Sequence, residues 1–101
     1  MLEGLTVDTF AGAVGDAFAL DHDGGRLELE LVEASPIEAD APAIAADGVR
    51  TPFSLLFRGP LNPILPQRIY PLRHDAIGAL QIFIVPVART AAGVEYQAIF
   101  T

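Results

Sequence analysis

The stretch RLELELVEA, residues 26–34, alternates between polar and apolar side chains from Arg26 to Leu31. Its three leucines fall on one side of an extended chain, and its first two glutamates fall on the other. A period of two does not fit the 3.6-residue repeat of a helix, so this stretch predicts a β-strand with one buried and one solvated face. The preceding DAFAL and the turn sequence DHDGGR complete a β-hairpin, because adjacent glycines readily take positive φ.

Four further short segments have the same extended character, and turn residues separate them. They are FSLLFRG (53–59), RIYPLRH (68–74), ALQIFIVPV (79–87) and VEYQAIFT (94–101). The connections DAIG and RTAAG are short, which favours an antiparallel meander.

A short helix is expected over residues 7–14, where Phe10, Ala13 and Val14 recur at helical spacing. Residues 35–50 show no clear period, and they predict either a long surface loop or a stray helical turn. Together these segments predict one domain, residues 1–101, that is mainly β. The expected fold is a small antiparallel barrel or sandwich of about six strands with one short N-terminal helix.

Composition excludes several classes of protein. The chain is 51% apolar and 19% charged, which indicates a folded domain rather than a disordered tail. Its net charge is −7, so no nucleic-acid partner is expected, because phosphate recognition needs a basic surface. No apolar run approaches the roughly 18 residues that span a bilayer, and the N-terminus lacks a basic region, so we expect a cytoplasmic protein without a membrane partner.

Charge is distributed unevenly along the chain. Residues 1–47 contain eleven acids and one arginine, a net −10, whereas residues 48–101 contain two acids and five arginines, a net +3. Either the two halves face each other within one copy, or an acidic face of one copy meets a basic face of another. The intramolecular arrangement is favoured, since surface charge patterns mostly serve solubility.

The segment GPLNPILPQ, residues 59–67, places three prolines between two predicted strands. Each proline fixes φ and removes a backbone donor, so this segment must leave the sheet. It holds Leu61, Ile64 and Leu65 in a fixed shape. These side chains either fold back to plug one end of the barrel, which is favoured, or stay exposed as anchors for a partner.

Strand 79–87 is apolar on both faces, with Leu80, Ile82 and Ile84 on one face and Phe83 and Val85 on the other. Such a strand lies centrally, under the helix, or at a subunit contact. A core position is favoured slightly, because a small domain uses most of its apolar area internally. If these two segments contact a partner instead, the candidate interaction residues are Leu61, Ile64, Leu65, Phe83 and Val85.

No motif for catalysis, cofactor binding or metal binding is present. DHD at 21–23 and HD at 74–75 place carboxylates beside an imidazole, but neighbouring residues of an extended chain point to opposite sides. Ser35 and Ser54 do not lie in a G-x-S-x-G elbow, and no glycine-rich phosphate loop precedes a helix. We expect no catalytic residues, no cofactor and no metal, and we do not expect an enzyme.

The run FSLLFRGPLNPILPQRIYPLRH, followed by GALQIFIVPV and EYQAIFT, is similar to a family of short bacterial proteins catalogued as a domain of unknown function. Phe10, Val14, Gly15 and Phe18 also match this family, and the resemblance covers nearly the whole chain except residues 35–50. It implies a free-standing β-rich domain, encoded in some cases near phage-tail-collar-like proteins. It implies no catalytic residues.

The favoured hypothesis is a structural or interaction module that self-associates or docks on a protein of a larger assembly, such as a tail-collar-like protein of a phage-tail-like assembly. The alternative is a small-ligand-binding β-barrel, although large side chains at the expected inward positions argue for a filled interior. An enzyme is the least favoured interpretation.

Overall fold

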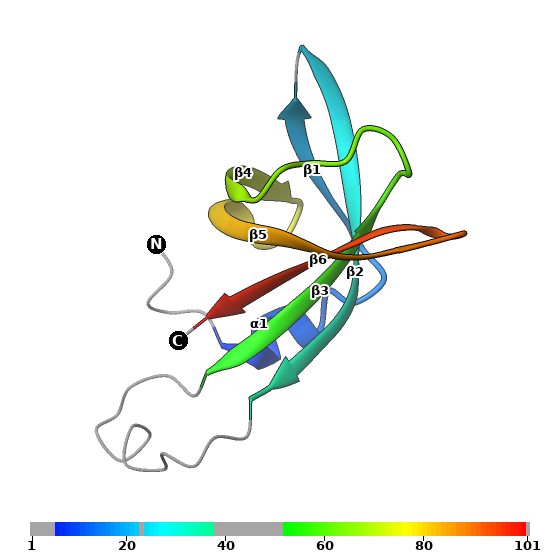
Figure 1. Ribbon diagram of the computed structural model, residues 1–101. Helices are drawn as coiled ribbons and strands as arrows, with labels where there is room; N and C mark the ends of the chain where they lie inside the picture. The colour runs from blue at the N-terminus through cyan, green and yellow to red at the C-terminus, as the bar shows by residue number, and fades with distance from the viewer. Residues whose placement is uncertain (1–5, 23, 38–51, 101) are drawn as a thin grey trace.

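The computed structural model describes residues 6–22, 24–37 and 52–100 (Figure 1). The elements are α1 (Val7–Ala11), β1 (Ala17–His22), β2 (Gly25–Pro36), β3 (Phe53–Gly59), β4 (Arg68–His74), β5 (Gly78–Thr90) and β6 (Gly93–Phe100). The strands close into an antiparallel barrel in the order β1-β2-β3-β6-β5-β4. The predicted fold, mainly β with one short N-terminal helix, is therefore confirmed, and it is a barrel rather than a sandwich. The helix in the described residues is too short to cross a membrane.

Most element boundaries lie close to the predicted ones. β3 and β4 match their segments, because glycine and proline punctuate both. α1 ends at Ala11 rather than at residue 14, since Gly12 forms its C-cap. β2 continues to Pro36 and so includes the start of the predicted loop, while residues 38–51 of that loop lie outside the described residues.

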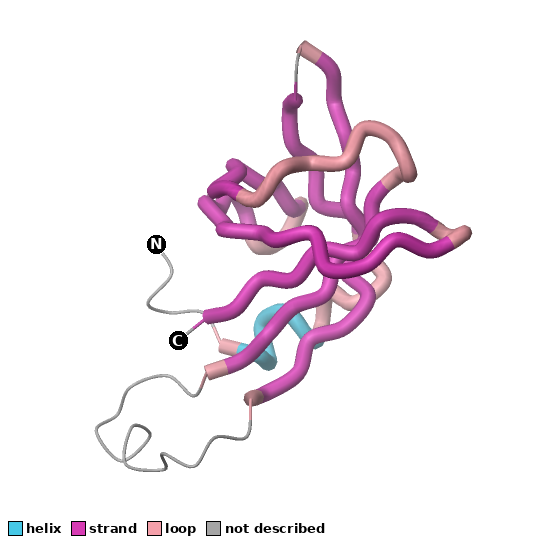
Figure 2. Tube along the Cα trace, in the orientation of Figure 1, coloured by secondary structure: helices cyan, strands magenta, loops and turns pink. Residues whose placement is uncertain are grey.

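The barrel consists of two three-stranded meanders, β1-β2-β3 and β4-β5-β6. They join where β3 pairs with β6 along its whole length, and where β1 pairs with β4 at Ala19 and Arg73. In this order β3 and β4 lie on opposite sides of the barrel. Residues 60–67 must therefore cross one end of the barrel, and Figure 2 shows this loop passing over the strands. The prolines stand where the chain leaves one meander for the other.

The middle strand of each meander is bent by a bulge. In β2 the register with β3 shifts after Leu31, and in β5 the register with β6 shifts between Pro86 and Ala88. An extra residue bends a strand and increases its twist, and a bulge tolerates a proline that has no N–H for the ladder. β5 pairs with β4 up to Ile84 and with β6 from Val85 onwards, and its bulge lies within the part that pairs with β6.

Alternate residues of every strand fill the barrel, and α1 covers one end of it. Phe10 of α1 is fully buried, and its ring centroid lies 5.7 Å from that of Phe53 and 5.6 Å from that of Phe100. Phe18 joins this cluster at 6.4 Å from Phe10. Ring pairs at such distances add to the stabilisation that burial provides. The helix packs against β2 and β3, and it does not cover β5.

Two glycines meet where β3 ends and β6 begins. Gly93 has a φ of 146°, and a Cβ on it would overlap the carbonyl oxygen of Gly59. A Cβ on Gly59 would lie 2.6 Å from Cδ2 of Leu29, closer than side chains normally approach. Gly93 therefore requires glycine, both for its backbone conformation and for its contact with the backbone of Gly59, whereas a side chain at Gly59 would force the buried Leu29 to shift.

Candidate functional site

The proline segment closes the end of the barrel that α1 leaves open. Leu65 is fully buried in the core, and its backbone N–H donates to the hydroxyl of Tyr96 at 2.9 Å. Next to it, the Tyr70 hydroxyl donates to the carbonyl of Pro66 at 2.7 Å. Burial raises the pKa of the Tyr70 phenol, and the Arg68 guanidinium, 5.8 Å from the ring centroid, partly opposes that rise. Leu65 thus lies in the core, as the favoured plug interpretation predicts, and its side chain is not on the surface as the alternative of a partner anchor requires.

The other two apolar side chains of the segment face outwards. Leu61 is 36% exposed and Ile64 is 46% exposed. Ile64 is exposed although the next residue, Leu65, is fully buried, so the two side chains point to opposite sides of the segment. The segment therefore divides between the two predicted roles, with one residue in the core and two on the surface.

The outer side of the β4–β5 hairpin is the second exposed apolar site. We call it the β4–β5 face, and its outward residues are Ile69, Pro71, Arg73, Ala79, Gln81, Phe83 and Val85. Ile69 and Phe83 are directly opposed across the two strands, and they are 59% and 50% exposed. The predicted core position of Phe83 under the helix is wrong, because α1 covers the end of the barrel instead. Val85 is half-buried.

The charged side chains lie largely away from the β4–β5 face. β2 carries three exposed glutamates and occupies the side of the barrel opposite β5. Among the described residues the face contains no acid, and its single charge, Arg73, lies 3.6 Å from the carboxylate of Asp21. That ion pair links the acidic and basic halves of the chain, whereas Arg58 pairs with Glu95 of its own half at 3.2 Å. The halves therefore face each other only in part.

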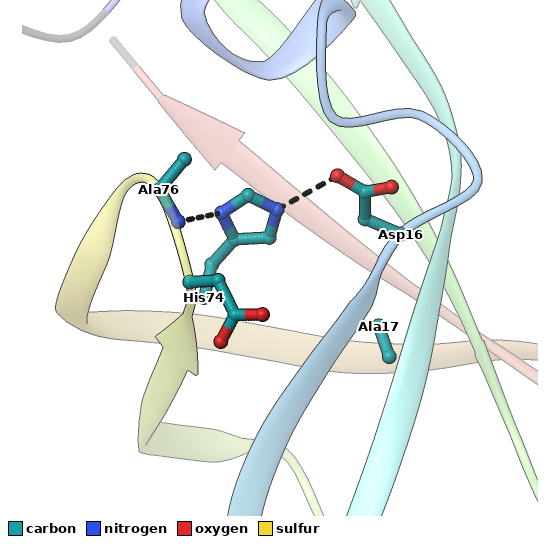
Figure 3. Close-up of a pocket in the computed structure, with 5 residues that line it drawn as sticks. Asp16, Ala17, His74 and Ala76 are labelled. Atoms are coloured by element: carbon teal, nitrogen blue, oxygen red, sulfur yellow. Dashed lines mark hydrogen bonds and ion pairs between the residues drawn. The ribbon is translucent and has the colours of Figure 1, made fainter.

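A pocket of about 320 Å³ lies outside the barrel wall, where the chain enters β1 and the β4–β5 turn begins (Figure 3). Asp16, Ala17, His74, Asp75 and Ala76 line it. The ring of His74 is held on three sides. Its Nε2 lies 2.9 Å from Oδ2 of Asp16, and its Nδ1 accepts backbone N–H groups of Ala76 and Ile77, each at 3.1 Å. The third contact is a stack on Phe18, with ring centroids 4.7 Å apart.

These contacts assign the proton of the neutral His74 ring. Two amide donors require Nδ1 to be the acceptor, so Nε2 carries the hydrogen and donates it to Asp16. A general base needs a free lone pair aimed at a substrate proton, and both ring nitrogens are already engaged. The arrangement fastens the β4–β5 turn to the segment before β1, and both nitrogens of the His74 ring are used in doing so.

The two described residues of the DHD sequence, Asp21 and His22, contact different side chains. Asp21 pairs with Arg73, and the ring of His22 lies 6.5 Å from that of Tyr70. Asp23 lies outside the described residues. Within the described ranges no three His, Cys, Asp or Glu side chains come close enough together to hold a metal ion.

The two serines oppose each other in the β2–β3 pairing and have no histidine beside them. Ser35 and Ser54 are register partners, and the Ser35 hydroxyl donates to Glu33 at 2.6 Å. A nucleophilic serine requires an adjacent base. The structure brings these serines to no such group among the residues that it describes.

Sequence reasoning missed Ile69 and the tie between Asp16 and His74. Ile69 could have been found by counting back from the DAIG turn, because the register His74↔Gly78 places Ile69 opposite Phe83. The His74–Asp16 contact has no local signal, since the two residues are 58 positions apart in the chain.

Comparison with known proteins identifies the family without identifying an activity. No curated protein and no solved structure matches the chain. A family model described as a domain of unknown function (DUF6916) matches residues 5–100, which includes every described strand. The chain therefore belongs to the DUF6916 family, whose shared domain has no established function.

Proposed function

We propose that the protein is an interaction module that docks on another protein through the β4–β5 face. The observation that carries this proposal is the exposed pair Ile69 and Phe83, side by side on a face that contains no acid among the described residues. The cores of protein interfaces are depleted in charge and enriched in aromatic side chains. Adjacent exposed apolar side chains, here 59% and 50% exposed, favour association with a partner that covers them.

The proline segment supports the same class of function. Leu61 and Ile64 are displayed on a loop whose prolines fix much of the backbone, so binding orders few additional bonds. Rigid apolar residues of this kind serve as anchors at interfaces. A role as an accessory domain of a larger assembly, such as the phage-tail-like one that the resemblance implies, would use both sites.

The alternative of a small-ligand-binding barrel is less well supported. The inward residues are large and buried, and the described pocket lies outside the barrel wall. A carrier of this size needs an internal cavity, and ligand sites typically enclose most of the ligand.

The proposal is tested by comparing two substitutions in the full chain. Phe83→Asp places a charge on the β4–β5 face, and Val14→Asp places one at a similarly exposed position after α1. Tagged proteins are used to capture partners from an extract of the native host, with quantification by mass spectrometry. We expect Phe83→Asp to abolish the specific capture that the wild type and Val14→Asp retain. Equal capture by all three proteins would contradict a docking role for this face.

A further inference from the structure

We infer that the occupant of the β4–β5 face is a second copy of this chain, docked face to face about a two-fold axis. This inference rests on the proposed function and specifies its partner. It follows from two features of the described surface: where the carboxylates lie and where the apolar pair lies.

The distribution of charge selects this face for self-association. Each copy carries a net charge of −7, so two copies repel each other through most orientations. The exposed glutamates Glu28, Glu30 and Glu33 lie on β2, on the side of the barrel opposite β5. Two copies that meet through their β4–β5 faces keep these six glutamates remote from the contact, and none of the seven residues that define the face is acidic.

The apolar pair makes the face self-complementary. A two-fold axis brings the same patch of both subunits together, so Ile69 and Phe83 meet their own counterparts. The flanking Arg73 already has Asp21 as a partner at 3.6 Å, so it does not bring an unpaired charge into the contact.

A head-to-tail arrangement fits the surface less well. A head-to-tail contact between the β4–β5 face of one copy and the β2 side of another would bury carboxylates on apolar side chains. The two arrangements differ in their response to salt. Screening strengthens a face-to-face dimer of two like-charged copies, whereas it weakens a contact between acidic and basic faces.

The test is sedimentation equilibrium of the purified full chain over a range of concentrations. We expect a monomer–dimer equilibrium with a limiting mass twice the 10.7 kDa of the chain. Raising the salt from about 0.1 M to about 1 M shortens the Debye length from about 10 Å to about 3 Å, and it should tighten the dimer. Phe83→Asp should weaken dimerisation at least about tenfold, whereas Val14→Asp should leave it unchanged.

Folding of the variants is checked by circular dichroism. Should Phe83→Asp perturb the barrel, Phe83→Thr provides a milder change, because threonine keeps a high preference for strands. NMR chemical shifts that change with the concentration of the wild type give an independent measurement. We expect such changes only in β4 and β5, which form the dimer contact.

Three results would overturn the inference: a wild type that stays monomeric, a dimer that Phe83→Asp and Phe83→Thr leave intact, or a dimer that salt dissociates. A monomeric wild type that still loses its host partners with Phe83→Asp would remove the second copy and keep the proposed function. If Phe83→Asp changes neither the capture of host partners nor the mass in sedimentation, both the dimer and the proposed function are contradicted.

Discussion

Truncation of Leu65 to alanine tests whether the proline segment is part of the core. The Leu65 side chain is fully buried, and its backbone N–H would keep the hydrogen bond to Tyr96 in the variant, so only packing is lost. Removing three carbons at about 0.8 kcal/mol each gives about 2.4 kcal/mol before any cavity term. Cavity formation brings the expected loss of unfolding free energy to about 2–5 kcal/mol.

The adjacent Ile64→Ala is the matched control. Ile64 is 46% exposed in the same rigid segment, and surface substitutions of this kind change stability by about 0.5 kcal/mol or less. The assay is urea denaturation followed by circular dichroism, with calorimetry as a second measurement. At about 4–8 °C per kcal/mol for a domain of this size, Leu65→Ala should lower Tm by at least about 8 °C. Equal losses in the two variants would refute the assignment of Leu65 to the core and Ile64 to the surface.

Three further variants test contacts around the same end of the barrel. Tyr96→Phe leaves the buried N–H of Leu65 without its acceptor, and urea denaturation should show a loss of about 1–3 kcal/mol. Gly93→Ala should cost more than about 1 kcal/mol, because its Cβ would overlap the Gly59 carbonyl at a φ of 146°; unchanged stability would contradict this geometry. Burial raises the pKa of the Tyr70 phenol above 10.0, so the unfolded state ionises first. Stability should therefore fall as pH rises above about 10, and the fall should be smaller in Tyr70→Phe; identical pH profiles would contradict it.

The strands could be predicted from the sequence because the local signals agree with the fold. Alternating leucines and glutamates define β2, and Gly59 and the prolines after it end β3 where predicted. The closed order of the strands had no comparable signal. It depends on β3 pairing with β6, whose residues lie 35 or more positions apart in the chain, and such pairings arise only from the assembled core.

The candidate site was predicted in part, and the errors have one physical cause. Alternation places Phe83 on the face opposite Ile82, but it does not say whether a helix covers that face. The helix is held by Phe10 inside an aromatic cluster at the end of the barrel, which leaves Phe83 exposed. In the same way, prolines show that a segment leaves the sheet, but only the crossing path decides that Leu65 rather than Ile64 turns inwards.

The crossing loop also makes the barrel resemble two subunits joined by a covalent tether. Residues 60–67 are the only described link between the meander that ends with β3 and the meander that begins with β4, and most contacts within each meander are between strands adjacent in the chain. The interface between the two halves consists of the β3–β6 and β1–β4 seams and the shared core. Cleavage within the loop would release the tether without breaking either seam. The two pieces, each a three-stranded meander, should then reassociate through these two seams. The position of the cut relative to Leu65 decides which piece carries the plug.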